Sequence, residues 1–571
     1  MRSLLLTLTM SLFVVSTTTA QYSGGTGEPN DPYQIATAAD LIALGETPED
    51  YDKHFVLTAD IDLDPNLPGR KVFDKAVIAP DMNGVTGSFE GTAFTGCLDG
   101  RNHTISHLMV RGTCYLGLFG LLGFGHSMAT IRDVGVTGAN VSGSRSFVGG
   151  LVGLCENGTM TGCHASGVVS GLGCVGGFVG WSRRGVVTRC HSTAAVTGKS
   201  DVGGLAGLSH GGAVMTQCCS EGTVGGHMGI GGLVGENVGT LTQCYSAATT
   251  SGIGDKPSSI GGLVGLNKGS ITQCYSVGAV AGYYSVGGLV GANHGFLTEC
   301  YSTGAVTSGS RPVAGLVGGS VGYATADLCF WDTQTSGQGA SSGGVGKTTS
   351  EMQTAKTFLD AGWDFVGETA NGTDDIWKIA EGLGYPRLSW EKYSGGSGEP
   401  NDPYQIATVA DLIALGETPD DYDKHFVLAA DIDLDPNLPG RKVFDRAVIA
   451  PDVNDLQYNF QGTAFTGAFD GSGRTIRNLT IADPNHDCLG LFGMIATGGW
   501  VGNLALENAE ISGGRRSINV GTLAGYNAGT LAECSATGIA IGCGNVRELA
   551  GYNTGSITNC QAEVRVIWLC R

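Results

Sequence analysis

Three aspartates alternate along one short stretch of the chain, in a pattern that can do chemistry. Asp60, Asp62 and Asp64 stand in the segment "DIDLD". A second copy of this segment carries the equivalent residues Asp431, Asp433 and Asp435. If the segment is a strand, alternation places the three carboxylates on one of its faces. Their oxygen atoms suit a calcium ion, and a pair of carboxylates suits the acid–base work of a glycosidase or lyase.

The neighbouring residues limit this interpretation. A helix-loop-helix calcium site needs glycine at its sixth position and glutamate at its twelfth. Counted from Asp60, these positions hold Pro65 and Lys71. The aspartates can equally form a polar strand edge at the start of a domain. We keep calcium at these three aspartates as the candidate metal site, assign no catalytic residues, and predict no other cofactor.

A second candidate site is a column of side chains that directly follow a repeated cysteine. Its members are His164, His191, Cys219, Tyr245, Tyr275, Tyr301 and Phe330. Alternation along a strand points these side chains outward when the cysteine points inward. Tyr245, Tyr275 and Tyr301 are therefore candidates for binding a sugar ring or a partner protein. The alternatives are a stacked ladder that protects the strands, and a metal shared by the two histidines.

These columns depend on an internal repeat with a period near 27 residues. The pattern G-[LF]-[VA]-G begins at Gly150, Gly177, Gly204, Gly232, Gly262, Gly288 and Gly315. Dense glycine among β-favouring residues disfavours helical repeats and favours one coil of a β-solenoid per unit. The fold class predicted is therefore all-β, a parallel solenoid of about 27-residue coils. The usual chirality of parallel connections makes it right-handed.

A cysteine recurs 9 to 11 residues after the last glycine of each central unit. The positions are Cys163, Cys190, Cys218, Cys244, Cys274, Cys300 and Cys329. Valine and leucine replace it in divergent units, at Val134 and Leu504. We therefore expect buried, mostly free thiols that pack as small hydrophobic side chains. The rival interpretation is a disulfide framework, because the chain holds 17 cysteines and carries an export signal.

Asparagine forms a further column two residues after the motif. It occupies Asn237, Asn267, Asn293, Asn527 and Asn553, with glycine two positions later. Asparagine and glycine tolerate left-handed backbone and can bond the turn of the next coil. We interpret this column as structural.

The chain contains two copies of one module. Residues 22–82 recur at 393–453 with six substitutions. Within the module, Thr37 is the predicted N-cap of a short helix with Leu41, Ile42 and Leu44 on its apolar face. Such a helix covers the open end of a solenoid. A second predicted helix, capped by Ser350, belongs to a closing segment after the first array.

These features predict six parts of the chain. They are a signal peptide (1–20), an N-terminal cap with the first coils (21–116), a repeat solenoid (117–332), a closing cap and linker (333–392), a second cap with first coils (393–489) and a second, short solenoid (490–571). The second solenoid stops after two motif units, so we expect either a truncated array or an open last coil that pairs with another chain.

Composition excludes several classes of protein. The net charge is −20, and no cluster of lysine and arginine is present, which argues against nucleic-acid binding. The first 20 residues combine Arg2, an apolar stretch and a small-residue cleavage site, which is typical of a signal peptide. No later apolar run is long enough to span a membrane. The expected location is therefore secreted or at the cell surface.

The repeat units resemble the GLUG-motif repeat family of secreted bacterial proteins. The resemblance rests on G-L-x-G followed by N-x-G-x-[IL]-x-x-C-Y-S-x-G-x-V, over about 117–332 and 490–563. It implies an adhesin-like surface protein and no catalytic residues. Some members accompany immunoglobulin-cleaving metallopeptidases, but this chain has no H-E-x-x-H motif.

Two hypotheses of function follow. The first is an exported, non-enzymatic scaffold that binds glycans or cell-surface proteins along a solenoid face. The second is a polysaccharide lyase or glycoside hydrolase on a β-helix, which rests on fold analogy alone. The seven central coils are nearly identical, whereas an active site normally interrupts a repeat with unusual polar residues. A purely structural spacer is a third interpretation.

Overall fold

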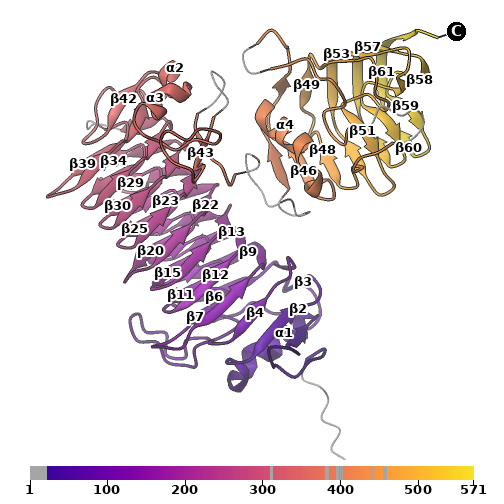
Figure 1. The fold of residues 1–571 in the computed structure, drawn as a ribbon. Helices are drawn as coiled ribbons and strands as arrows, with labels where there is room; N and C mark the ends of the chain where they lie inside the picture. The colour runs from indigo at the N-terminus through magenta and orange to yellow at the C-terminus, as the bar shows by residue number, and fades with distance from the viewer. Residues whose placement is uncertain are drawn as a thin grey trace, which may run out of the picture. The chain divides into compact units, whose positions relative to one another are not determined.

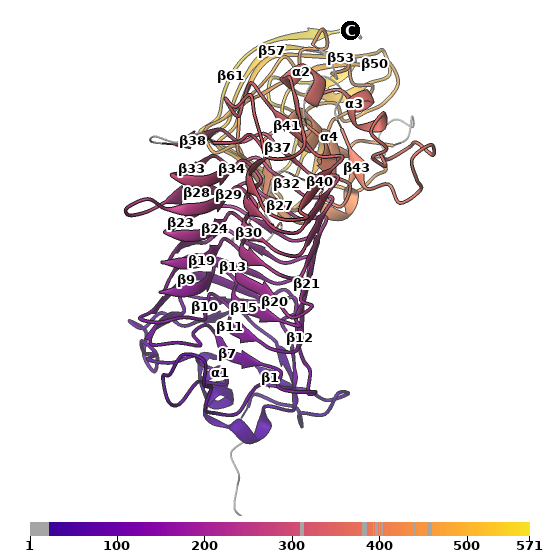
Figure 2. The same ribbon diagram turned by 90° about the vertical axis from the view of Figure 1, so that its left-hand side faces the viewer.

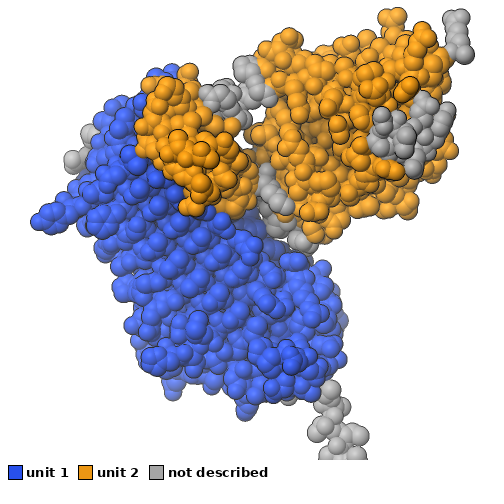
Figure 3. All heavy atoms as spheres, viewed as in Figure 1, with its two compact units in different colours: residues 1–349 blue, residues 350–571 orange. Residues whose placement is uncertain are grey.

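The computed structural model describes residues 22–308, 313–379, 385–391, 393, 398, 400, 403–438, 441–453 and 460–570. The predicted signal peptide lies outside the described residues. The chain divides into two compact units, residues 1–349 and 350–571 (Figure 3). Both are built almost wholly from short parallel strands (Figure 1).

Each central coil of the first unit has four sides, and every side contributes to one parallel sheet (Figure 2). Strands of successive coils pair in register, so Val234 lies opposite Val264, and Val264 lies opposite Val290. We number the four sheets 1 to 4. This architecture confirms the predicted parallel β-solenoid, and its handedness stays a prediction.

Sheet 1 has eleven strands. They are β1 (Tyr33–Ile35), β2 (His54–Leu57), β4 (Cys97–Asp99), β8 (Ala129–Arg132), β12 (Gly158–Thr161), β16 (Val186–Thr188), β21 (Val214–Thr216), β26 (Thr240–Thr242), β31 (Ser270–Thr272), β36 (Phe296–Thr298) and β40 (Thr325–Asp327).

Sheet 2 carries one long strand or two short strands per coil. They are β3 (Ile61–Asp62), β5 (Thr104–Ser106), β6 (Met109–Gly112), β9 (Gly135–Gly143), β13 (His164–Ser170), β17 (His191–Ser192), β18 (Ala195–Thr197), β22 (Cys219–Ser220), β23 (Thr223–Gly226), β27 (Tyr245–Ser246), β28 (Thr249–Gly252), β32 (Tyr275–Ser276), β33 (Val280–Gly282), β37 (Tyr301–Ser302), β38 (Val306–Ser308), β41 (Phe330–Asp332) and β42 (Val345–Lys347).

Sheets 3 and 4 complete the coil. Sheet 3 contains β10 (Val148–Gly149), β14 (Gly173–Gly176), β19 (Ser200–Gly203), β24 (Met228–Gly231), β29 (Ser258–Gly261) and β34 (Tyr284–Gly287). Sheet 4 contains β7 (Phe119–Leu122), β11 (Val152–Cys155), β15 (Val179–Arg183), β20 (Ala206–His210), β25 (Val234–Asn237), β30 (Val264–Asn267), β35 (Val290–Asn293) and β39 (Val317–Ser320).

The second unit repeats this plan on a smaller scale. Its strands are β43 (Trp377–Lys378), β44 (Arg387–Leu388), β45 (Tyr404–Ile406), β46 (His425–Leu428), β47 (Ile432–Asp433), β48 (Ala468–Asp470), β49 (Thr475–Arg477), β50 (Thr480–Asp483), β51 (Phe492–Ile495), β52 (Trp500–Gly502), β53 (Ala505–Gly513), β54 (Ile518–Val520), β55 (Ala524–Asn527), β56 (Thr530–Ala532), β57 (Ser535–Gly542), β58 (Gly544–Val546), β59 (Ala550–Asn553), β60 (Ser556–Thr558) and β61 (Gln561–Trp568).

A capped helix begins each unit's solenoid, as the duplicated module predicts. They are α1 (Ala38–Glu46), followed by the short η1 (Pro48–Asp50), and α4 (Val409–Glu417), followed by η2 (Pro419–Asp421). Thr37 caps α1, and Asp40 completes a capping box. Leu41 and Leu44 are fully buried in the core.

The segment after the first array differs from its prediction in two ways. The single helix expected from Ser350 is two short helices, α2 (Thr349–Met352) and α3 (Ala355–Leu359), because Ser350 lies inside α2 and Thr354 begins the next. The stack of strands also continues past 332, since β42 pairs with β41.

The rest of that segment belongs to the second unit. Arg387 forms an ion pair of 3.0 Å with Asp411, which completes the capping box of α4 with its N-cap Thr408. The Asp411 side chain is only 1% exposed, so this contact holds the segment onto the helix. Loss of either partner would leave the other charge buried and unpaired, so the two residues must stay together. This segment lies in the second compact unit, which begins at residue 350.

The interior of the coils confirms the predicted cysteine column. Cys163, Cys218, Cys244, Cys274 and Cys300 are completely buried. Fifteen of the 17 cysteines are free thiols. The disulfide framework is therefore wrong for this chain, with one exception: a bridge joins Cys543 to Cys570. Stacked cysteines project in parallel, which is poor geometry for a bridge.

The asparagine column confirms its structural interpretation. The Asn237 amide donates to the Asn267 side-chain oxygen at 2.9 Å, and Asn267 donates in the same way to Asn293. The side-chain oxygen of Asn237 accepts the Gly239 N–H at 3.1 Å. These amides are fully buried, so each coil satisfies the polar groups of its neighbour.

Sheets 3 and 4 pack backbone against backbone, and this contact explains the last glycine of the motif. A methyl group on Gly235 in β25 would lie 2.4 Å from the backbone between Asp201 and Val202 in β19. Gly207, Gly265 and Gly291 lie in the same way against the preceding coil. Backbone cannot withdraw as a flexible side chain can, so the close approach requires glycine.

We predict that Gly235→Ala lowers the free energy of unfolding by about 1–3 kcal/mol, the cost of overpacking a close contact. Thermal and urea unfolding of residues 21–571 would measure it. Gly339→Ala is the control, because nothing lies within 4 Å of its added methyl group. Equal stability of the two variants would contradict the backbone contact.

Candidate functional site: the outer seam of the first solenoid

We call the outer line where sheets 3 and 4 meet the seam. The last glycine of each motif lies against the preceding coil. The residue that follows this glycine therefore stands beside a residue of that coil. The seam pairs are Tyr115 with Leu154, Phe147 with Trp181, Cys174 with Leu208, and Asp201 with Glu236. The first member of each pair, Tyr115, Phe147, Cys174 or Asp201, has left-handed backbone, with φ between 49° and 66°.

The first half of the seam is aromatic. The Phe147 and Trp181 rings are stacked, with centroids 5.3 Å apart, and Tyr115 lies 4.9 Å from Phe147. Phe147 is buried and Trp181 is half-buried. The Trp181 Nε1–H has no acceptor among the described residues. That N–H is itself buried, so the half-buried indole offers a ligand the exposed part of its apolar face.

The next part of the seam is acidic. Glu236 replaces the leucine that occupies this place in the preceding coil, Leu208. The Asp201 side chain leans over Gly229, because a methyl group there would lie 3.0 Å from its Oδ1. Asp201 thus extends toward the coil that carries Glu236. Lys268, from the following coil, donates to Glu236 at 2.7 Å.

The electrostatics of this pair are unusual. Burial, and then the charge of Glu236, raise the pKa of Asp201 to about 6, with Lys268 opposing the shift. A carboxyl with this pKa is half protonated near pH 6 and mostly ionised at pH 7, while its neighbour Glu236 is paired with a lysine. Two neighbouring carboxyl groups in such different surroundings are the pattern of an acid–base pair, and both can accept hydrogen bonds from hydroxyl groups.

The predicted calcium site does not have metal-binding geometry. The Asp60 carboxylate accepts the Thr104 N–H at 2.8 Å and lies 3.2 Å from His103 Nδ1. Asp62 lies 2.9 Å from His107 Nδ1, and this contact lowers the pKa of its carboxyl group. The described residues contain no cluster of three groups that could hold a metal.

The second module supports this conclusion about the aspartates. Asn478 stands where the first module has His107, and its amide donates to Asp433 at 2.8 Å. Both modules therefore keep a hydrogen-bond donor to the aspartate, although the second module lacks the histidine ring nitrogen. An amide N–H cannot ligate a cation. The carboxylates bond neighbouring coils together, and their residues do not fit calcium.

The tyrosine column is stacked as a ladder, but it is buried. The Tyr245 and Tyr275 ring centroids are 5.1 Å apart, and Tyr275 and Tyr301 are 4.9 Å apart, each pair within 7° of parallel. Their exposed fractions are 5%, 4% and 1%. This corrects the expectation of an exposed platform. Alternation fixes the side of the strand, and it does not reveal what covers that side.

The two histidines of the same column also stack. The His164 and His191 rings lie 5.1 Å apart and within 13° of parallel. They continue the tyrosine ladder and belong to no metal-binding cluster of the described residues.

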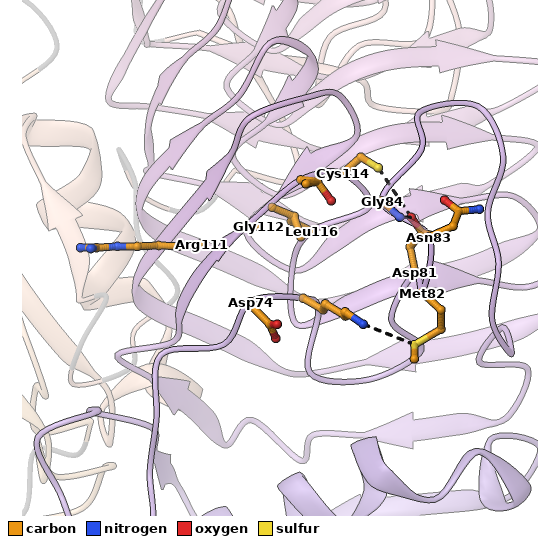
Figure 4. Close-up of a pocket in the computed structure, with 11 residues that line it drawn as sticks. Asp74, Asp81, Met82, Asn83, Gly84, Arg111, Gly112, Cys114 and Leu116 are labelled. Carbon is orange, nitrogen blue, oxygen red and sulfur yellow. Dashed lines mark hydrogen bonds between the residues drawn. The ribbon is translucent and has the colours of Figure 1, made fainter.

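A pocket of about 490 Å³ lies beside the aromatic half of the seam (Figure 4). Asp81, Cys114 and Arg111 are among its lining residues. The buried Asp81 accepts the N–H groups of Gly84 and Glu90. In Figure 4 the Arg111 side chain extends away from the other labelled residues.

The pocket contains no activated nucleophile. Burial and the neighbouring Asp81 raise the pKa of the Cys114 thiol, which keeps it protonated and unreactive. The polar groups of the pocket mainly hold its own loop, so the seam remains the better candidate site.

Sequence reasoning missed the seam, although a signal was present. The column after the motif glycine reads Leu154, Trp181, Leu208, Glu236, Leu266 and Ala292. Tryptophan and glutamate interrupt an aliphatic column. Their partners Phe147 and Asp201 lie in the preceding coil, and only the close contact of sheets 3 and 4 brings them together.

Comparison with known proteins gives partial likenesses. No family model matches the chain. A stretch of 147 residues is 36% identical to halomucin of Haloquadratum walsbyi, and covers 26% of this chain and 2% of that protein. A stretch of 152 residues is 32% identical to a "Putative Gly-rich membrane protein" of Evansella cellulosilytica, and covers 25% of this chain and 15% of that protein. The chain thus spans a small part of these relatives.

One solved structure has a low level of similarity to this chain. It is described as a "putative immunoglobulin A1 protease" from Bacteroides ovatus, with 18% sequence identity and a TM-score of 0.36, over 65% of this chain and 96% of that one. Separately, no helix in the described part of this chain is long and apolar enough to cross a membrane.

We predict that Asp201→Asn stabilises the protein at neutral pH and not at acidic pH. The folded pKa, about 6, is raised above the unfolded value. The protonated Asp201 therefore contributes fully to the free energy of unfolding below about pH 4. This contribution is lost as the pH rises through 6. The gain at pH 7.5 should be on the order of 1–2 kcal/mol.

Thermal unfolding of wild type and variant at both pH values would test this. Asp255→Asn, at an exposed position, is the control. A difference between wild type and Asp201→Asn that does not change with pH would show that Asp201 is not held in a protonating environment.

Proposed function

We propose that the chain is an exported, extracellular repeat scaffold that binds polysaccharide along the seam. The observation that carries the proposal is the Phe147–Trp181 stack followed by the Asp201–Glu236 pair. Aromatic faces bind the apolar faces of sugar rings, and carboxylates accept hydrogen bonds from sugar hydroxyls. The two kinds of group lie in consecutive coils of one outer face.

Other features support this proposal. The relatives are named halomucin and a Gly-rich membrane protein, names that fit a place at or outside the cell surface. The N-terminal signal sequence and the net charge of −20 fit export and solubility. Membership of the GLUG-motif family remains part of the proposal, since it rests on the motif spacing alone.

Binding to a panel of soluble polysaccharides tests the proposal. We expect residues 21–571 to be retarded by at least one polysaccharide in affinity electrophoresis. Trp181→Ala should weaken binding about tenfold or more, equivalent to about 1.4 kcal/mol. Phe296→Ala is the matched control, because Phe296 is 54% exposed on sheet 1 of the same unit. No retardation, or equal loss in both variants, would refute binding at the seam.

A second candidate function is cleavage of the bound polysaccharide, as a lyase or glycoside hydrolase. The observation that favours it is the raised pKa of Asp201 beside the lysine-paired Glu236. A protonated Asp201 could donate its proton to the leaving oxygen, while Glu236 remains an acceptor.

Released oligosaccharide ends distinguish the two functions. Wild type would release ends if it cleaves, and Asp201→Asn and Glu236→Gln would abolish release while Trp181→Ala weakens binding. Silence from wild type, with and without calcium, would leave binding as the function.

A further inference from the structure

A second row of side chains runs beside the seam on the outer face of sheet 4. It consists of the residues two positions after the seam column, because alternation along a strand returns every second side chain to the same face. The in-register pairing of β11, β15, β20, β25, β30 and β35 aligns these residues from coil to coil. We call it the outer row, and its members are Glu156, Arg183, His210, Val238, Lys268 and His294.

The outer row is rich in basic residues, although the chain as a whole is acidic, with a net charge of −20. Four of its six members are arginine, lysine or histidine, and one is acidic. Arg183 is followed directly by Arg184, and both side chains are exposed. The fold does not require basic residues here, because the equivalent row of the second unit holds Ala496, Ala528 and Thr554.

The two arginines hold their positive charge on the outside of the coil. Arg183 Nη1 lies 3.3 Å, and Arg184 Nη2 lies 2.9 Å, from the same oxygen of Glu156, Oε1. The Glu156 side chain is 13% exposed, whereas the arginine side chains are 45% and 44% exposed. The guanidinium groups therefore cover the carboxylate and face the solvent, and one negative charge balances two positive charges.

Most hydrogen-bond donors of this pair are unused. A guanidinium group presents a fork of several N–H donors and has no acceptor. Within the described part of the chain, each of the two groups bonds only to Glu156, through one nitrogen. The remaining donors suit the paired oxygens of a carboxylate or a similar oxyanion, which guanidinium groups bind in a bidentate manner.

The next coil supports the stems of both arginines. A methyl group on Gly211 would lie 3.3 Å from Arg183 Cγ and 3.6 Å from Arg184 Cγ. The two stems therefore lie against this glycine. Gly211 and Gly212 both have left-handed backbone, with φ of 66° and 87°. This turn, which favours glycine, leaves room for the arginine stems and keeps their charged ends above the coil.

The arginine pair lies beside the aromatic half of the seam. Trp181 and Arg183 are two residues apart on β15, so they project from the same face about 7 Å from each other. His210 pairs with Arg183 from the next coil, and its ring lies edge-on to Trp181 with centroids 6.4 Å apart. A sugar ring on the exposed part of the Trp181 face can therefore place an anionic substituent against the guanidinium groups.

We propose that the polysaccharide bound along the seam is anionic, and that Arg183 and Arg184 bind its carboxylate or sulfate groups. The inference rests on the proposed function and specifies its class of ligand. The acids of the seam are compatible with it, because Asp201 and Glu236 lie further along, where uncharged sugar hydroxyls can donate to them. A nucleic acid fits less well, since it carries a charge on every unit and needs a longer basic stripe.

Affinity electrophoresis of residues 21–571 in gels that contain single polysaccharides tests the inference. Hyaluronan and polygalacturonate carry carboxylates, dextran sulfate carries sulfate esters, and dextran is the neutral member. We expect at least one anionic polymer to bind about tenfold or more tightly than the neutral one. This preference should fall as the salt concentration rises, because salt screens the exposed charges. Retardation by the carboxylate polymers or by dextran sulfate identifies which anionic group is bound.

The double variant Arg183→Gln/Arg184→Gln should weaken binding of the anionic polymer about tenfold and leave binding of neutral polysaccharides unchanged. Glutamine keeps a donor for Glu156 and removes the charge. Lys199→Gln/Lys256→Gln is the matched control, because it removes two positive charges from exposed residues outside sheet 4. Thermal unfolding checks that both variants are folded, and the salt dependence of the wild type tests the inference without any substitution.

Three results would overturn the proposal. One is a wild type that binds neutral polysaccharides and none of the anionic ones. Another is equal binding of the anionic polymer by the arginine variant and the lysine control. The third is a single-stranded oligonucleotide bound as tightly as the anionic polysaccharide. Failure of the proposed function looks different, since no polysaccharide of either kind would bind. Trp181→Ala should weaken binding of both kinds, whereas the arginine variant should weaken only the anionic kind.

Discussion

The fold depends on a contact that contains no side chains. At each turn of the motif, sheets 3 and 4 approach so closely that backbone touches backbone, as Gly235 does at Asp201 and Val202. This contact closes a coil of about 27 residues, because a side chain at that point would push the two sheets apart. It also explains the composition. The 96 glycines of the chain stand mainly at positions where a Cβ atom would collide with the backbone of a neighbouring segment.

The closed coil makes every unit dependent on the next one. Cysteine, serine and asparagine are buried in columns, and neighbouring coils supply partners for many of their polar groups. Ser220 Oγ, for example, donates to the Gly232 carbonyl at 2.7 Å in the following coil. A single coil would bury these groups unsatisfied, which is costly. Stability therefore resides in neighbouring pairs of coils, and the ends of the array become the places where the chain needs a cover.

Local patterns in the sequence predict those parts of the fold that repeat locally. The period, the inward cysteines, the asparagine ladder and the Thr37 helix cap all depend on residues close together in the chain, and all are confirmed. The buried tyrosines and the seam depend on contacts between segments far apart. Tyr275 obeys the alternation rule and is still covered, and Asp201 meets Glu236 only because the sheets fold tightly together. The closing segment shows the same limit, because the Arg387–Asp411 contact assigns it to the second unit.

The two modules separate what folds the chain from what the chain can bind. Columns that carry the fold are kept in both: Cys534 and Asn527 occupy the same buried positions as Cys274 and Asn267. The seam column is not kept. In the second unit its pairs are Cys488 with Tyr526 and Asn519 with Tyr552, and no carboxylate is among them. Seam side chains project from strands whose register is fixed by glycine and by buried ladders, so they can change without disturbing the coil. A repeat array of this kind can hold one structure constant while each coil presents a different chemical group. The first solenoid uses that freedom to place an aromatic stack and an acid of raised pKa along the same seam.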